Sequence, residues 1–174
     1  MAIKDSESLS RFPQSGWEYR DMIDLGALVG ECGYCGTEIR YCHILYHKSW
    51  GTISVGSLCA DRLTKDKTAS RREAEYKKYL ERLQRYLEST RWKSRKNGHF
   101  FALEGYMIRI WDHGSYCNLE IGYPVGNPQG RYQKYEYIRS RHRYESLDAA
   151  KRKAFEAIVS GKFREYLKRS GIIP

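Results

Sequence analysis

The sequence predicts an α+β protein made of a small cysteine-rich module, a long amphipathic helix, and a three- to four-stranded antiparallel sheet covered by a C-terminal helix. Three observations lead to this prediction. Four of the five cysteines lie between positions 32 and 59. Over residues 66–91 apolar side chains recur at spacings of three and four, the period of a helix. After residue 97 the period becomes that of strands.

The cysteine-rich module is expected over residues 1–65, with residues 1–30 as a weakly patterned lead-in. Cys32 and Cys35 are separated by two residues and followed by a glycine, a spacing that directs two thiolates at one ion. Strands expected at residues 38–46 and 51–55 lead to Cys59, at the start of an expected helix. The helix dipole there favours the thiolate that a metal requires.

This order of knuckle, hairpin and helix-borne cysteine resembles a treble-clef zinc finger over residues 31–63. Arg62 stands where most treble clefs have a second helix ligand, so the fourth ligand is expected from the hairpin. Strand alternation places His43 and His47 on one face and Cys42 on the other. We prefer His43, then His47, then Cys42. The resemblance implies a structural Zn²⁺ site with four protein ligands: Cys32, Cys35, His43 and Cys59.

Residues 39–47 and 55–60 also look like a small module of uncharacterised bacterial and phage proteins. That likeness implies a phage or mobile-element origin and assigns no activity. The alternative interpretation of the cysteines is a set of small buried hydrophobic residues.

The long helix and its linker, residues 66–96, are strongly basic. The formal net charge of the 174-residue chain is +10, and residues 62–99 alone carry 13 Lys/Arg against 5 Asp/Glu. Such a block attracts polyanions, of which nucleic acid is the commonest in cells, although a solvated helix face has the same composition. The basic residues expected to bind nucleic acid here are Arg71, Arg72, Arg91, Lys93, Arg95 and Lys96.

The C-terminal part, residues 97–174, is expected to hold strands at residues 99–103, 106–111 and 116–121, and a fourth at 131–139. Ser146 is a good N-cap for a helix that begins at residue 147 and stops at Gly161. Residues 162–169 are expected to form a last short helical segment.

Three strands followed by an alanine-rich helix weakly resemble the AP2-type DNA-binding domain, and the preceding helix gives the order of a double-stranded RNA-binding domain. The AP2 likeness implies that the exposed sheet face meets nucleic acid through Arg109, Trp111, Tyr116, Lys134, Tyr135, Arg139, Arg141 and Arg143. Arg139, Arg141 and Arg143 form the densest basic stretch and would contact phosphates. The alternative is a charged loop in water.

Neither an active site nor a membrane anchor is indicated by the sequence. The surroundings of Cys117, His113 and His142 match no known nucleophile motif, and phosphate-binding glycine loops are absent. We therefore expect no enzyme activity. No run of 18 apolar residues occurs and the N-terminus lacks the apolar stretch of a signal peptide, so we expect a cytoplasmic protein with reduced cysteines and no membrane partner.

Two functions remain open from the sequence. The first is a non-enzymatic, zinc-containing protein that binds DNA or RNA. The second is a protein–protein interaction module, such as a phage-type inhibitor or adaptor, for which the 15 tyrosines would supply contact surface. Affinity that falls steeply with salt is expected only for the first.

Overall fold

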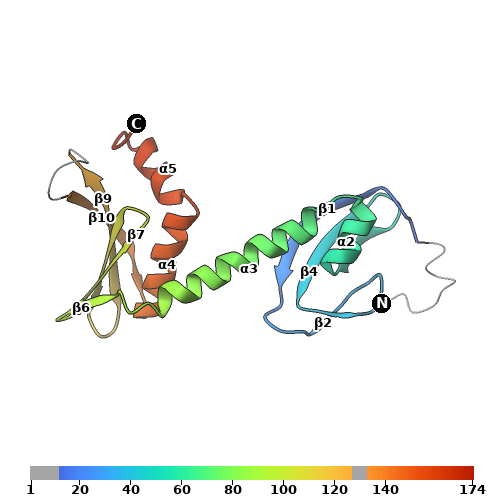
Figure 1. Ribbon diagram of the computed structural model, residues 1–174, viewed down its shortest axis with the longest axis horizontal. Helices are drawn as coiled ribbons and strands as arrows, with labels where there is room; N and C mark the ends of the chain where they lie inside the picture. Colours follow the sequence, from blue (N-terminus) through green and yellow to red (C-terminus); the bar gives the residue numbers. More distant parts are fainter. Residues whose placement is uncertain (1–11, 127–132) are drawn as a thin grey trace. The chain divides into compact units, whose positions relative to one another are not determined.

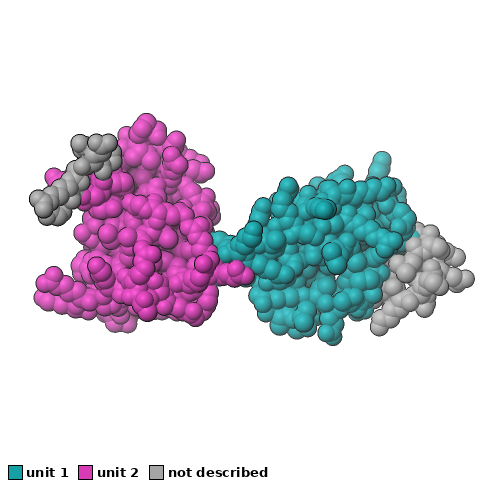
Figure 2. Space-filling model, in the orientation of Figure 1, with its two compact units in different colours: residues 1–80 teal, residues 81–174 magenta. Residues whose placement is uncertain are grey.

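The computed structural model describes residues 12–126 and 133–174 and confirms a mixed α+β fold. The chain forms two compact units, Met1–Leu80 and Glu81–Pro174, coloured separately in Figure 2. Their boundary lies inside helix α3 (Thr68–Leu87). The three-part division expected from the sequence, at residues 1–65, 66–96 and 97–174, therefore differs from the two units of the structure.

The first unit is built on a three-stranded antiparallel sheet with the order β1-β4-β5. The expected hairpin is confirmed as β4 (Tyr41–His47) and β5 (Gly51–Val55). The third strand, β1 (Trp17–Asp24), falls within the lead-in, for which the sequence predicted no element. Its register with β4 shifts between Tyr19 and Asp21, and this irregularity breaks the alternation by which a strand is recognised.

Two short elements flank this sheet. Strands β2 (Gly30–Glu31) and β3 (Glu38–Ile39) pair with each other, and α2 (Ser57–Thr64) follows β5 directly. The core that they share with the sheet is small, as expected for a unit of this length. Its buried residues are Phe12, Trp17, Cys32, Tyr34, Leu45, Val55, Ala60, Leu63 and Ala69.

Helix α3 is the long amphipathic helix predicted from the sequence. Two carboxylates hold its N-terminus: Asp61 Oδ1 accepts the backbone N–H groups of Ala69 and Ser70 at 3.0 and 3.2 Å, and Asp66 Oδ1 accepts that of Thr68 at 2.8 Å. The helix ends at Leu87, four residues before the expected end.

The second unit contains a five-stranded antiparallel sheet with the order β10-β9-β8-β7-β6. The expected meander is confirmed as β7 (Gly98–Leu103), β8 (Tyr106–Asp112) and β9 (Cys117–Val125). The fourth expected strand is β10 (Lys134–Tyr144), and residues 131–132 of that prediction lie outside the described residues. The edge strand β6 (Lys93–Arg95) was not predicted, because three polar residues give no strand signal.

Helices α4 (Leu147–Val159) and α5 (Lys162–Arg169) lie along one side of this sheet in Figure 1. Ser146 caps α4 as predicted, since its Oγ accepts the backbone N–H of Ala149 at 3.1 Å. Alternate strand residues and one face of α4 form the core, which includes Ile108, Ile110, Leu119, Ile121, Ala150, Ala154 and Phe155. Among the helices of the described residues, none is long and apolar enough to cross a membrane.

Phe155 is the residue on which we expect the second unit to depend most. Its side chain is fully buried and its ring centroid lies 5.1 Å from that of Tyr86 in α3. We expect Phe155→Ala to lower the free energy of unfolding by about 3–5 kcal/mol, because a large cavity remains. Urea denaturation measures this loss. Tyr166→Ala, at a half-exposed ring of α5, is the control, and an equal loss in both variants would contradict the assignment of this core.

Candidate functional site

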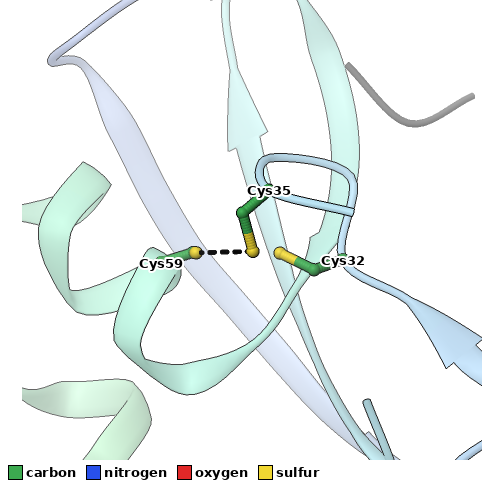
Figure 3. Close-up of side chains that lie close together, drawn as sticks. All are labelled: Cys32, Cys35 and Cys59. Atoms are coloured by element: carbon green, nitrogen blue, oxygen red, sulfur yellow. Dashed lines mark hydrogen bonds between the residues drawn. The ribbon is translucent and has the colours of Figure 1, made fainter. Parts of the chain in front are cut away.

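The structure brings three of the predicted metal ligands together. The Sγ atoms of Cys32, Cys35 and Cys59 all lie within 4.8 Å of one another, and those of Cys35 and Cys59 are 3.5 Å apart. Cys32 and Cys35 stand at the turn between β2 and β3, and Cys59 is in the first turn of α2 (Figure 3). Segments 24 residues apart in sequence are thus joined at one point.

Backbone hydrogen bonds give the cysteine turn its shape. Cys32 donates its N–H to the carbonyl of Thr37, and Gly36 donates to the carbonyl of Cys32, which closes a tight loop around Cys35. Gly36 has a φ of +75°, a conformation that glycine adopts without strain. The N–H of Gly33 reaches the carbonyl of Ser54 in β5 at 2.8 Å and ties the loop to the sheet.

The environment favours ionised sulfur at this point. The pKa of Cys32 is lowered, first because the thiol of Cys59 hydrogen-bonds to its sulfur and then because backbone amides do so, among them that of Gly56 at 3.4 Å. The pKa of Cys59 is raised, first because its thiol donates a hydrogen bond to the sulfur of Cys32, then because it is partly buried, and also because it hydrogen-bonds to Cys35. A thiolate surrounded by amide donors is what a thiophilic cation needs as a ligand.

His43, the fourth ligand preferred from the sequence, is not part of this cluster. Its ring is fully buried, with the hydroxyl of Tyr19 3.1 Å from Nδ1 and Oε2 of Glu73 3.2 Å from Nε2. Both ring nitrogens are therefore engaged by other residues. These partners could not be predicted from the sequence, because they lie 24 and 30 residues away from His43 along the chain. Tyr19 belongs to β1, for which no strand was expected, and the helical pattern of α3 does not show that Glu73 meets His43.

The two other ligands considered for the hairpin also lie outside the cluster. Nδ1 of His47 accepts the backbone N–H of Ser49 at 3.1 Å, and its ring packs 5.0 Å from that of Trp17. Cys42 is buried with its sulfur near Gly30. The expected four-ligand set is thus reduced to three cysteines among the described residues.

Three thiols at these distances fit a thiophilic divalent cation, and zinc is the ordinary choice for cysteine ligands spaced in this way. Zinc would be held by Cys32 and Cys35 of the turn and by Cys59 of α2. Its chemical contribution would be a cross-link between these segments.

The second candidate region is the face of the five-stranded sheet opposite α4 and α5, here called the open sheet face. The strand pairing aligns its residues in rows. One row runs across all five strands, and a second lies beside it. The first row is Lys93, Phe100, Arg109, Glu120 and Arg139. The second is Arg95, Gly98, Trp111, Asn118 and Arg143.

Aromatic rings lie against the backbone of this face. A Cβ atom added to Gly98 would meet the ring of Trp111 at 2.8 Å, and one added to Gly122 would meet that of Tyr137 at 2.6 Å. The guanidinium of Arg109 lies 3.5 Å from the ring centroid of Tyr137. The glycines therefore let the rings lie close to the sheet, where their outer faces are partly exposed.

Arginine dominates the charge of the open sheet face. Glu120 is the acidic residue of the two rows, and it forms a 2.9 Å ion pair with Arg139 and accepts the indole N–H of Trp111 at 3.3 Å. The guanidinium of Arg143 lies over the ring of Tyr116 at 4.6 Å. The two rows therefore contain five cationic side chains and one carboxylate, which is already paired.

The structure separates the predicted nucleic-acid-binding residues into groups. Lys93, Arg95, Arg139 and Arg143 share the open sheet face. Lys96 lies in the β6–β7 turn with a φ of +53°, and Arg91 stacks on Phe101, which belongs to the buried side. Arg141 lines a cavity between β10 and the two C-terminal helices. Arg71 and Arg72 belong to the first unit, where Arg72 covers the ring of Tyr19.

Phe100, Tyr137 and the two glycines beneath the rings were not predicted from the sequence as part of this face. Only the register between strands places these residues beside Arg109 and Trp111, and one sequence does not reveal register. The chain matches no protein-family model, no curated protein and no solved structure.

We expect Cys59→Ser to abolish tight metal binding and to unfold the first unit, because metal-binding energy here is folding energy. Metal analysis of the purified chain and thermal unfolding followed by near-UV circular dichroism measure the two effects. Cys42→Ala, which changes a cysteine outside the cluster, is the matched control and should keep one metal ion per chain. A normal melting curve and metal content for Cys59→Ser would contradict the metal centre.

His43→Gln should separate a structural role from metal ligation. We expect this variant to keep its metal but to lose about 1–3 kcal/mol of stability, because Tyr19 and Glu73 lose a buried hydrogen-bonding partner. Metal content and urea denaturation are measured on the same sample. Loss of the metal in His43→Gln at unchanged fold would show that His43 is a ligand after all.

Proposed function

We propose that this chain is a non-enzymatic, zinc-containing protein that binds nucleic acid through the open sheet face. The observation that carries the proposal is the combination of cationic and aromatic side chains in adjacent rows of that face. Phosphates are bound by arginine and lysine, and bases stack on aromatic rings.

The position of the charges suits a polymer that crosses the sheet. Lys93 and Arg95 lie on the edge strand β6, Arg139 and Arg143 on the opposite edge strand β10, and Arg109 between them on β8. The rings of Phe100 and Trp111 lie between these edges, 5.7 Å apart at their centroids. A strand whose bases are unpaired meets both kinds of contact at once, whereas a duplex offers its phosphates but keeps its bases stacked.

The metal has a supporting part in this proposal. Zinc at Cys32, Cys35 and Cys59 fixes the cysteine turn to α2 and so stabilises a unit whose core is small. The first unit would then present its own basic residues, among them Arg71, to phosphates.

A protein–protein interaction module is the second candidate, and one observation favours it. Leu28, Val29 and Leu58 of the first unit are exposed by 65, 73 and 80%. Leu28 and Leu58 line the same cavity, and a contiguous exposed apolar surface is typical of docking sites. Binding through them would depend weakly on salt, whereas binding through the open sheet face would weaken steeply.

We expect the double variant Arg95→Gln/Arg143→Gln to weaken binding to a labelled oligonucleotide. It should also reduce the dependence of log affinity on log salt by about one unit for each phosphate that the variant no longer neutralises. Fluorescence anisotropy at several salt concentrations measures both. The matched control is Arg164→Gln/Lys168→Gln on exposed positions of α5, which removes the same charge elsewhere. Equal weakening in both variants would leave only net charge as the cause.

Trp111→Ala should weaken binding of single-stranded oligonucleotides by about 1–3 kcal/mol, because a stacked base loses its platform. Binding of a duplex of the same length should change little. Tyr166→Ala, which removes an exposed ring on the helical side, serves as control. Unchanged single-strand affinity in Trp111→Ala would remove base stacking from the proposal.

A further inference from the structure

A cavity of about 460 Å³ lies directly against the three cysteines. Its volume is within the range of small-molecule sites. Polar groups on its wall come from Arg40, Glu73 and Lys77, and apolar groups from Leu28, Ile39 and Leu58. Cys32, Cys35 and Cys59 line it as well, so a cation at the cluster would border the cavity.

The donor set at this border is incomplete for a closed site. Structural zinc sites have four protein ligands, whereas sites that bind a further group have three and leave one position to that group. Among the described residues of the first unit three sulfurs converge. Both His43 and His47 are hydrogen-bonded to other residues, and Cys42 is buried outside the cluster. Residues 1–11, which the structure does not describe, contain neither cysteine nor histidine.

We propose that the metal bound by Cys32, Cys35 and Cys59 keeps one coordination position for a ligand from outside the chain, and that the cavity accepts a neutral nitrogen donor of the imidazole type that carries an apolar group. This inference rests on the metal binding put forward above. It replaces the closed four-ligand site expected from the sequence.

Charge and wall chemistry define the class of ligand. Three thiolates already exceed the double positive charge of the metal, so a neutral donor is favoured over a further anion. Glu73 and Lys77 form a 2.5 Å ion pair with each other, and Arg40 pairs with Asp24 through two hydrogen bonds of 2.8 and 3.0 Å. These cations are therefore already neutralised. The apolar walls, of which Leu28 and Leu58 are largely exposed, favour a ligand with an apolar body.

The test uses the full chain loaded with Co²⁺, whose visible absorption reports the donors around the metal. Imidazole and 4-phenylimidazole are titrated separately into the reduced protein. We expect both to change the Co²⁺ spectrum, and 4-phenylimidazole to bind about tenfold more tightly, the effect of removing roughly 60 Å² of apolar surface from water. A spectrum that neither compound changes, with Co²⁺ still bound, would overturn the open position.

Adjacent residues provide matched variants for the cavity. Leu28 lines it and Val29 does not, although both are exposed and apolar. Leu28→Asn should reduce the preference for 4-phenylimidazole towards equality, and Val29→Asn should leave it at about tenfold. Equal affinities of the two compounds in the unmodified chain would exclude the cavity as the binding site for the apolar group.

Two further outcomes separate this inference from the proposed function. If Cys42→Ala changes the Co²⁺ spectrum before any compound is added, Cys42 is the fourth ligand and the inference fails while the metal centre stands. If the unmodified chain binds no Co²⁺ or Zn²⁺, the metal centre itself fails and the inference with it. Oligonucleotide binding by the same samples tests the open sheet face independently of both results.

Discussion

The meeting of the cysteine turn with α2 is the constraint on which the first unit depends. The unit has few buried apolar residues, and Cys32 is one of them. A core of this size provides little free energy beyond the entropy lost on folding. A cation bound by Cys32, Cys35 and Cys59 would close the loop between these two distant segments and would so compensate for the small core.

The second unit depends instead on strict alternation along its strands. Ile108 and Ile110 point to the helices, so Arg109 and Trp111 must point away from them. The same packing that buries the aliphatic residues therefore gathers arginines and rings on the other face. The same alternating pattern thus determines both the core face and the candidate interface. A shift of register by one residue would move the side chains of each face to the other.

Local patterns in the sequence predicted the parts of the fold that depend on local physics. Spacing identified Cys32 and Cys35, helical period identified α3, and capping chemistry identified Ser146. The features that the sequence did not indicate depend on contacts between distant segments. The sequence does not indicate that Tyr19 and Glu73 contact the two ring nitrogens of His43. Nor does it indicate that Phe100 and Tyr137 lie beside Arg109 on one face of the sheet.

Helix α3 has a consequence for the cooperativity of unfolding. Its first turns are buried with the core of one unit through Ala69, and its last turns with the core of the other through Leu83 and Tyr86. A helix is costly to nucleate and easy to extend. Each unit, once folded, therefore supplies a helical nucleus from which the shared segment grows along the chain. Unfolding of either unit removes one of these two nuclei, so the continuous backbone of α3 couples the stabilities of the two units.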